Sequence, residues 1–265
     1  MSNVAVVVPF YNQHEHTIRC IKSLLRTYGN KPSRIVIYND GSSEESAEKV
    51  SRFIASETDH TDIVFISSEE NRGFINAVNS AFLFSVKGLY EYFVILNNDT
   101  VVSSNWLFNL VAAMETNPNV GVVGPLTTYG SKHQMISFVS PNDNNQIDYR
   151  SFNDETIEEV GKWVENSMTT NIVGDDVKLS GFCMGTRSSL FETAGMFNKE
   201  FGFGSAEESY YRWQLRTKFK KTSMLVRNAF VWHYGHVTFG SHPTINSKQL
   251  WQDNQKLFDK LTGAM

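Results

Sequence analysis

The stretch VILNNDTVVSSNW, residues 94–106, begins as an apolar run and then places Asn97, Asn98 and Asp99 in a row. An uninterrupted apolar run of this kind is typical of a parallel strand that is covered on both faces. In an open parallel sheet, ligands bind outside the carboxyl ends of the strands. The stretch therefore predicts a buried strand that delivers three polar side chains to a binding edge.

The rest of the first half alternates strand and helix patterns. Apolar strand patterns occupy residues 4–10, 34–40, 62–67, 92–99 and 120–125. Between them, apolar residues recur at helical spacing, and Ser42, Ser43 and Gly73 stand at predicted helix starts. Strand–helix alternation implies right-handed crossovers and a parallel sheet. We therefore expect an α/β fold in which helices flank a Rossmann-like, mostly parallel sheet.

The second half is less regular. Residues 127–177 are rich in Asn, Asp, Ser and Thr, and their weak periodicity predicts an irregular segment with a functional or mobile role. Regular patterns resume as a strand over 178–188, a helix over 206–219, a strand over 223–234 and an amphipathic helix within 241–265. Neither a repeat nor a linker divides the sequence, so we expect one domain over residues 1–265.

Composition excludes several classes of protein. The 265 residues carry a formal net charge of −4 and no basic tail, which argues against nucleic-acid binding by phosphate neutralisation. Cys20 and Cys183 each lie in an apolar run, as expected for buried thiols in a reducing compartment. No apolar run is long enough for a membrane span. We expect a soluble, cytoplasmic protein; peripheral contact with the inner face of the membrane and the oligomeric state stay open.

Polar clusters follow four of the predicted strands. They are Pro9-Phe10-Tyr11-Asn12, Asn39-Asp40-Gly41-Ser42-Ser43, Asn71-Arg72-Gly73 and Asn97-Asn98-Asp99. Each alone suits a turn or a helix cap, but four at one sheet edge indicate a ligand. The sequence has neither a Gly-x-Gly-x-x-Gly motif after its first strand nor a Walker lysine, which disfavours dinucleotide and P-loop sites. A diphosphate held here would need another countercharge, and a divalent cation on Asp99 would serve.

This ordered set of motifs resembles family 2 glycosyltransferases with the GT-A fold. The motifs are PFYN (9–12), NDGSS (39–43), NRG (71–73) and LNNDT (96–100), and the later stretches 179–213 and 231–240 fit the same pattern. The resemblance implies a GT-A domain with a nucleotide-sugar-binding half at 1–126, an acceptor-binding half at 127–240 and a C-terminal helix in 241–265. It also implies inverting transfer from a UDP- or dTDP-sugar to a saccharide or lipid-linked saccharide, by analogy with bacterial surface glycan synthesis.

For the donor, the resemblance implies that Pro9, Tyr11 and Asp40 line the nucleobase pocket. An Asp there can accept the imide N–H of uracil or thymine. Asn71 and Arg72 fall where the family approaches the nucleotide. Arg72 either reaches the diphosphate or is a solvated surface guanidinium, and the sequence leaves both readings open.

For the metal, LNNDT stands in the place of the family's DxD motif. Asn97 replaces the first acid, so it and Asn98 are expected to bind nucleotide or sugar groups, while Asp99 binds the metal. The resemblance implies His233 as a further metal ligand, with His236 as the alternative. An imidazole ligand favours Mn²⁺ over Mg²⁺, although both cations remain candidates.

For the chemistry, the family places its base in a Glu-Asp pair that opens a helix. Here the pair is Glu207-Glu208, so Glu208 is the expected base and Glu207 supports acceptor hydroxyls. The same two carboxylates would also suit the helix dipole. Gly181 and Trp213 are expected to contact the acceptor. Gln214 stands where the family has an arginine.

Two other functions are alternatives to glycosyl transfer. A nucleotidyltransferase would need a Gly-rich, basic loop after the first strand, and PFYNQHEH (9–16) lacks one. A non-catalytic carbohydrate- or nucleotide-binding module of the same fold remains the alternative, because Asn97, Glu208 and Gln214 all depart from the family pattern.

Overall fold

The computed structural model describes residues 3–27, 31–57, 62–138, 148–235 and 245–263. Its strands are β1 (Val4–Phe10), β2 (Arg34–Asp40), β3 (Ile63–Ser68), β4 (Tyr92–Leu96), β5 (Thr100–Val102), β6 (Val120–Leu126), β7 (Ile172–Gly174), β8 (Cys183–Arg187) and β9 (Thr222–His233). Its helices are α1 (His14–Arg26), α2 (Glu44–Ser56), α3 (Phe74–Ser85), α4 (Trp106–Thr116), α5 (Asp154–Ser167), α6 (Ser188–Thr193), α7 (Glu207–Phe219) and α9 (Ser247–Thr262), with 3₁₀ turns η1 (Tyr149–Ser151) and η2 (Lys199–Phe201).

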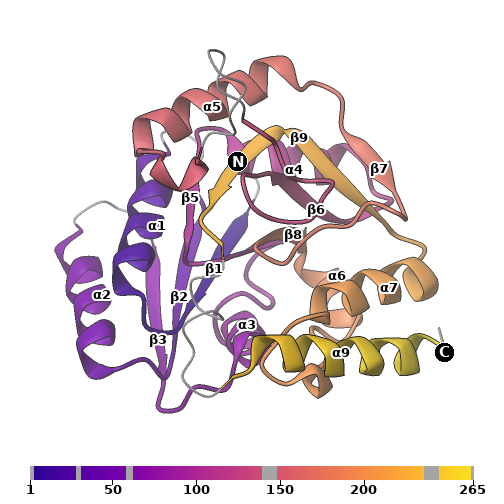
Figure 1. Ribbon diagram of the computed structural model, residues 1–265, viewed down its shortest axis with the longest axis horizontal. Helices are drawn as coiled ribbons and strands as arrows, with labels where there is room; N and C mark the ends of the chain where they lie inside the picture. The colour runs from indigo at the N-terminus through magenta and orange to yellow at the C-terminus, as the bar shows by residue number, and fades with distance from the viewer. Residues whose placement is uncertain (1–2, 28–30, 58–61, 139–147, 236–244, 264–265) are drawn as a thin grey trace.

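A central sheet connects both halves of the chain (Figure 1). Its strand order is β3-β2-β1-β4-β8-β6-β9-β5, and β7 pairs with β9. Strands β1 to β4 are mutually parallel, as the sequence predicts, whereas β8 runs antiparallel to both β4 and β6. The antiparallel strand places the later half of the chain beside the carboxyl end of β4, because Leu96 is paired with Cys183.

Two predicted strands are shorter than expected. The strand predicted over 178–188 begins only at Cys183. Strand β4 ends at Leu96, so Asn97, Asn98 and Asp99 form a turn, and β5 begins immediately after them at Thr100. Within this turn, Thr100 Oγ1 donates a 2.7 Å hydrogen bond to the carbonyl of Asn97.

The prediction of an irregular segment over 127–177 is wrong for part of its length, because helix α5 lies within it. Asn153 is its N-cap and accepts a hydrogen bond of 2.8 Å from the amide of Thr156. Ile157 and Val164 are buried on one face, and Gly161 lies so close to β5 that an added Cβ would come within 2.2 Å of Ser103 Cβ. The helix is therefore held by tertiary contacts that its polar composition does not reveal.

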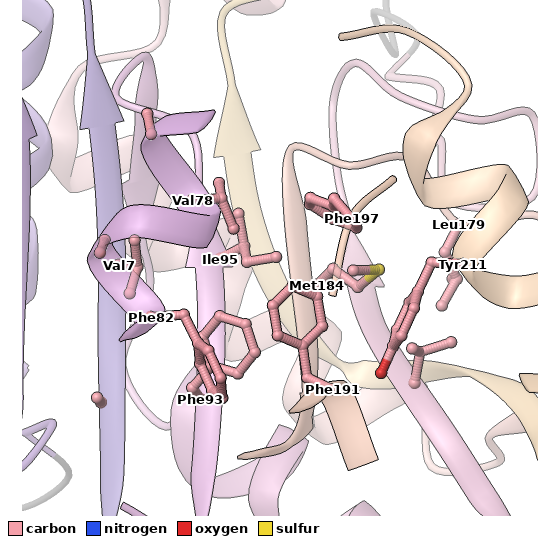
Figure 2. Packing of buried hydrophobic residues seen from close by; sticks show 14 of the residues in the cluster. Val7, Val78, Phe82, Phe93, Ile95, Leu179, Met184, Phe191, Phe197 and Tyr211 are labelled. Carbon is pink, nitrogen blue, oxygen red and sulfur yellow. The ribbon is translucent and has the colours of Figure 1, made fainter. Parts of the chain in front are cut away.

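The core has a layer on each face of the sheet. Side chains alternate along β1, so Ala5 and Val7 face the layer with α3, α6 and α7, while Val6 and Val8 face the layer with α1, α2 and α4. In the first layer, the ring of Phe191 packs against three other aromatic rings (Figure 2). Its centroid lies 5.1 Å from the ring centroid of Phe82, 4.8 Å from that of Phe93 and 5.3 Å from that of Tyr211.

This aromatic contact joins α3 of the first half to α7 of the second, and it fixes the helix that carries Glu207 and Glu208. In the described ranges, no helix combines the length and the apolar character needed to cross a membrane.

Candidate active site

A cleft of about 630 Å³ opens at the carboxyl ends of β1, β2 and β4. Its walls hold most of the residues that the sequence predicts for the site: Pro9, Tyr11, Asp40, Asn71, Asn97, Asn98, Asp99, Gly181, Glu207, Glu208 and His233. Arg72 and Trp213 do not line it, and His236 lies outside the described residues. The fold thus brings residues from both halves of the chain to one cavity.

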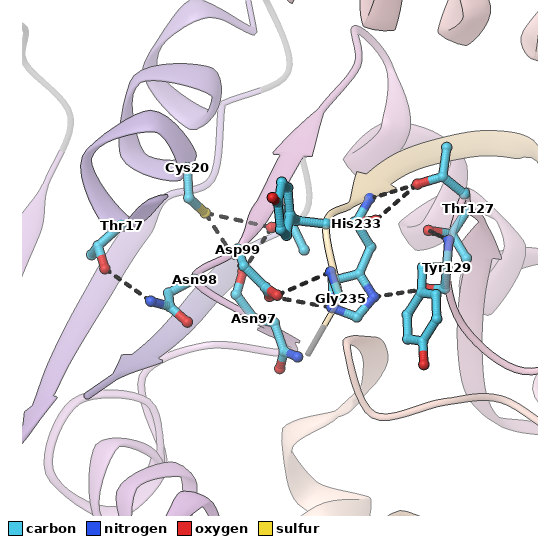
Figure 3. Close-up of polar contacts among 12 residues, drawn as sticks. Thr17, Cys20, Asn97, Asn98, Asp99, Thr127, Tyr129, His233 and Gly235 are labelled. Atoms are coloured by element: carbon cyan, nitrogen blue, oxygen red, sulfur yellow. Dashed lines mark hydrogen bonds and ion pairs between the residues drawn. The ribbon is translucent and has the colours of Figure 1, made fainter. Parts of the chain in front are cut away.

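Asp99 and His233 both line this cleft and lie beside each other (Figure 3). Strands β5 and β9 pair antiparallel with Thr100 opposite His233, so the preceding Asp99 lies beside the end of β9. Asp99 Oδ1 is 3.2 Å from His233 Nε2, and Asp99 Oδ2 accepts a 3.2 Å hydrogen bond from the amide of Gly235. Both side chains are buried.

The hydrogen bonds of His233 determine its tautomer. Its Nδ1 lies 2.7 Å from the carbonyl oxygen of Tyr129, and a carbonyl only accepts, so Nδ1 carries the proton. In the neutral ring, Nε2 then presents a lone pair towards Asp99. The ring is held in place by Phe182, which stacks on it at 4.8 Å between centroids.

This pair suits a divalent cation. Asp99 Oδ1 is buried, and it faces His233 Nε2 at 3.2 Å. A cation between them would take the place of an Nε2 proton and would be bound by one oxygen and one nitrogen. Burial raises the pKa of Asp99, but the interactions with His233 and His16 outweigh that effect and leave the pKa below its usual value. Asp99 is therefore ionised at neutral pH. Across the described ranges no cluster of three or more His, Cys, Asp or Glu is arranged around a metal position, so a cation here would depend on phosphate oxygens or water as well.

The turn that carries Asp99 is held from several sides. Asn98 donates a 3.0 Å hydrogen bond from Nδ2 to Thr17 Oγ1 of α1, and the amide of Asn97 donates to the carbonyl of Phe182 at 2.7 Å. Cys20 Sγ lies 3.8 Å from the carbonyl of Asn97. The side chain of Asn98 is therefore held by its hydrogen bond to α1. The side chain of Asn97 lines the cleft. The contacts with Thr17, Cys20 and Phe182 have no recognisable signal in the sequence.

Asp40 holds the loop that leads into α3 through two hydrogen bonds. Its two carboxylate oxygens accept hydrogen bonds from the amides of Arg72, at 3.0 Å, and Gly73, at 2.8 Å. Burial raises its pKa, and these amides only partly offset that effect. The guanidinium of Arg72 is mostly exposed and lies 3.7 Å from the carboxylate of Glu70. Of the two predicted arrangements, contact with the diphosphate or a solvated surface position, the structure has the surface position.

The carboxylate pair opens α7 on the opposite side of the cleft. Glu207 is the first residue of the helix and is buried, and its Oε2 has no hydrogen-bond partner among the described residues. Burial and the neighbouring Glu208 raise the pKa of Glu207 well above its usual value, despite its place at the positive end of the helix dipole. Glu208 is less buried and accepts a 3.3 Å hydrogen bond from Ser209 Oγ.

Gly181 faces this pair, but the space beside it does not require a glycine. A Cβ at that position would lie 3.8 Å from Glu207 Oε1 and from Glu208 Cβ, which is ordinary van der Waals contact.

Helix α9 supplies contacts that the sequence did not suggest. Asn254 is buried and donates from Nδ2 to the carbonyls of Phe201, Gly204 and Ser205 at 2.9, 2.7 and 3.0 Å, which holds the loop before Glu207. An Asn on the apolar face of an amphipathic helix was the available signal. Lys248 and Trp251 also line the cleft, whereas Trp213 stacks on Tyr210 at 5.6 Å beside a neighbouring cavity.

Solved glycosyltransferases have the same architecture. GalNAc-T7, solved with UDP, GalNAc and Mn²⁺, has a TM-score of 0.65 at 15% identity, over 88% of this chain and 44% of that one. The mannosyltransferase PcManGT from Pyrobaculum calidifontis, solved with GDP-Man and Mn²⁺, has a TM-score of 0.60 at 18% identity, over 87% of this chain and 56% of that one. The fold is therefore the GT-A fold of glycosyltransferases, as the motifs predict.

The sequence comparison names the family. The model of glycosyl transferase family 2 matches residues 5–164, and the chain belongs to that family. Poly-beta-1,6-N-acetyl-D-glucosamine synthase of Staphylococcus epidermidis is 32% identical over 124 residues, which are 46% of this chain and 28% of the synthase. The chain thus spans less than a third of this relative's length. Asp40 and Asp99 lie within the family match, and Glu208 and His233 lie beyond it.

Proposed function

We propose that the protein is an inverting, metal-dependent glycosyltransferase that moves a sugar from a UDP- or dTDP-sugar to a hydroxyl of a saccharide acceptor. One observation carries the proposal: the buried Asp99–His233 pair and the carboxylate of Glu208 line the same cleft of about 630 Å³. A cation site and a base on one cavity are what transfer from a diphosphate leaving group requires.

The donor diphosphate lies against Asp99 and His233. A cation bound there, Mn²⁺ or Mg²⁺, supplies Lewis acidity that neutralises the charge developing on the departing diphosphate. The nitrogen ligand favours Mn²⁺, and Mn²⁺ is present in the solved GalNAc-T7 and PcManGT. Asn97, which replaces an acid of the family motif, binds a ribose or sugar hydroxyl without adding charge.

The nucleoside occupies the part of the cleft between β1 and β2. Pro9 and Tyr11 line it, and Asn71 lies at its edge. Asp40 already accepts two backbone amides, but a carboxylate has about four acceptor positions. It can therefore also accept the imide N–H of uracil or thymine, which favours these bases over adenine, whose ring nitrogens only accept.

The acceptor approaches from the side of α7. Its hydroxyl oxygen attacks the anomeric carbon as the bond from that carbon to the diphosphate oxygen breaks, the bonding pair leaves with the diphosphate, and the hydroxyl proton passes to Glu208. Burial and Glu208 raise the pKa of Glu207, and a protonated Glu207 would donate a hydrogen bond to the acceptor without competing for its proton. The relation to the synthase of Staphylococcus epidermidis supports a saccharide acceptor of a bacterial surface glycan.

A non-catalytic binding module is the second candidate, and one observation favours it. Gln214 stands where the family has an arginine, and its buried Oε1 has no hydrogen-bond partner in the described part of the chain. Such a module would bind the donor without turning it over.

A thermal-shift screen of nucleotide-sugars, with and without Mn²⁺, tests the proposed function, because ligand binding to the native state raises the melting temperature. We expect uridine or thymidine diphosphate sugars to raise it only when Mn²⁺ is present. Slow donor hydrolysis under the same conditions would separate an enzyme from a binding module. Binding of adenine and uracil nucleotides with equal affinity would contradict the donor assignment.

A further inference from the structure

A second cavity of about 350 Å³ lies next to the cleft on the side of α7 and α9. The two share Ala206, Ser209 and Gln255 as lining residues. Trp213 and Phe258 contribute apolar surface to the second cavity. The cavity therefore adjoins the side of the cleft where the proposed base lies.

The charges around this cavity are mainly positive. Four cationic side chains line it, from Lys178, Arg212, Arg216 and Lys221, against two carboxylates, from Asp175 and Asp176. Both aspartates are exposed and are solvated by water. None of the four cations forms an ion pair within the described residues. Lys221 Nζ donates a 2.8 Å hydrogen bond to the carbonyl of Pro118.

Arg212 is the most deeply placed of these cations. Its Nη1 donates to the carbonyl of Val177 at 3.2 Å and its Nη2 to Ser209 Oγ at 3.0 Å, but its buried Nε has no partner in the described ranges. Arg212 is half-buried, and a guanidinium that is partly removed from water without a paired anion is costly. Burial lowers the pKa of Arg212, and the like charge of Arg216 adds to that effect while Glu208 opposes it. An anion in the cavity would relieve this imbalance.

The cavity is also connected to the proposed base. Arg212 donates to Ser209 Oγ, and Ser209 Oγ in turn lies 3.3 Å from Glu208 Oε1. A group that engages Arg212 would therefore help to fix the rotamers of Ser209 and Glu208.

We propose that this cavity binds an oxyanionic group of the acceptor, a phosphate or a carboxylate, while the reacting hydroxyl of the same acceptor chain lies in the cleft. The inference rests on the proposed function and narrows its acceptor to a saccharide that carries an anionic group. Arg212 and Arg216 provide forked donors suited to such anions, and Lys178 adds charge from the facing loop. Trp213 packs against the ring or carbon chain that carries the anion.

Calorimetric titration of the full chain with small probes at low salt tests the inference. The probes are glycerol 3-phosphate, glucuronate and, as the neutral control, glucose. Arg216→Gln and Lys178→Gln each remove one exposed cation from opposite walls of the cavity. Lys260→Gln removes an exposed cation of α9 that does not line the cavity, and it is the control.

We expect at least one of the anions to bind the wild type and glucose not to bind. Affinity for that anion should fall about tenfold or more in Arg216→Gln and in Lys178→Gln, and should stay within about twofold in Lys260→Gln. The stronger of the two anions identifies phosphate or carboxylate as the group bound. Equal affinity in all four proteins, or binding of glucose as tight as that of the anions, would overturn the inference.

A parallel titration with UDP and Mn²⁺ separates this inference from the proposed function. UDP should bind all four proteins alike, because none of the substituted residues lines the donor side. UDP binding without anion binding would contradict the inference about the acceptor but not the proposed glycosyltransferase function. Failure of UDP, dTDP and their sugars to bind would remove the proposed function itself.

Discussion

Asp99 Oδ1 lies 3.2 Å from His233 Nε2 because β5 pairs antiparallel with the end of β9, with Thr100 opposite His233. The carbonyl of Tyr129 holds the proton on Nδ1, so the other ring nitrogen faces the carboxylate. A register shift of one residue would turn the His233 side chain to the other face of the strand and separate the pair.

Substituting Asp99→Asn should abolish Mn²⁺-dependent donor binding. Asn keeps the size of the side chain and an acceptor for the amide of Gly235, but it removes the charge that a cation needs. The loss of UDP affinity in the presence of Mn²⁺ should exceed the ~10–100-fold that loss of an outer-shell partner costs. Calorimetry measures it, and Mn²⁺ binding alone can be followed by electron paramagnetic resonance. Asp62→Asn, at an exposed ion pair with Arg34, should change neither quantity; unaltered Mn²⁺ binding by Asp99→Asn would refute the metal role.

Substituting Glu208→Gln should stop transfer while donor binding survives. Without a base, the acceptor proton has no place to go in the transition state, so kcat should fall about 10²–10⁴-fold. The affinity for UDP with Mn²⁺ should remain within about twofold, since the donor lies on the other side of the cleft. Glu200→Gln, an exposed carboxylate in η2, is the control and should transfer normally. Rates in Glu208→Gln that match the wild type would assign the base elsewhere.

Glu207 should make the protein less stable as the pH rises. Its pKa in the folded state is raised by burial and by Glu208, whereas in the unfolded chain it is about 4.3. Between these two values the unfolded state releases a proton that the folded state keeps, so the free energy of unfolding falls with increasing pH. The effect is about 1.4 kcal/mol for each unit of difference in pKa.

Glu207→Gln cannot titrate and should lose this part of the pH dependence. Urea unfolding at pH 5 and pH 7.5 measures it: the variant should gain stability relative to the wild type as the pH rises. Glu200→Gln should follow the wild type at both pH values. A difference between Glu207→Gln and the wild type that is the same at both pH values would mean that Glu207 is ionised in the folded protein.

Gly73→Ala should destabilise the protein more than Gly88→Ala. Both glycines have positive φ, at 85° and 72°, so each substitution strains the backbone. Gly73 also has a ψ of 165°, a region that is essentially limited to glycine and costs other residues about 1–3 kcal/mol. A Cβ at position 73 would also lie 2.5 Å from Phe203 Cα, whereas nothing lies within 4 Å at position 88. The resulting overpacking should add about 1–3 kcal/mol. Chemical denaturation measures both variants, and equal losses would contradict the close packing of the α3 start against the loop before α7.

Much of the fold could be predicted because its patterns are local. The buried strands of the first half are continuous apolar runs, and Ser43 and Gly73 cap helices where the sequence suggests. Helix α5 escaped prediction because its buried face is only Ile157, Gly161 and Val164. The predicted strand over 178–188 is shorter because residues before Cys183 line the cleft rather than join the sheet.

The sequence predicts which residues line the candidate site, but not which of them are held by hydrogen bonds to the rest of the protein. Asp99, Glu208 and Asp40 line the expected cleft. Asp40 is also engaged by two backbone amides, and Asn98 lines the cleft while its Nδ2 bonds to Thr17. Asn254 and Trp251 were missed because helix α9 reaches the site through packing on α7, which no local pattern records.

The sequence by itself determined that VILNNDT would bury a strand and end in polar residues, because alternation, burial and turn chemistry depend on near neighbours along the chain. Only the tertiary structure decided which of those residues face a ligand. Strand pairing between β5 and β9 brings His233 to Asp99, the antiparallel β8 lies beside β4, and the packing of α7 brings Glu208 to the same cleft. These contacts join distant parts of the chain, so they follow from how the elements pack and not from any one segment.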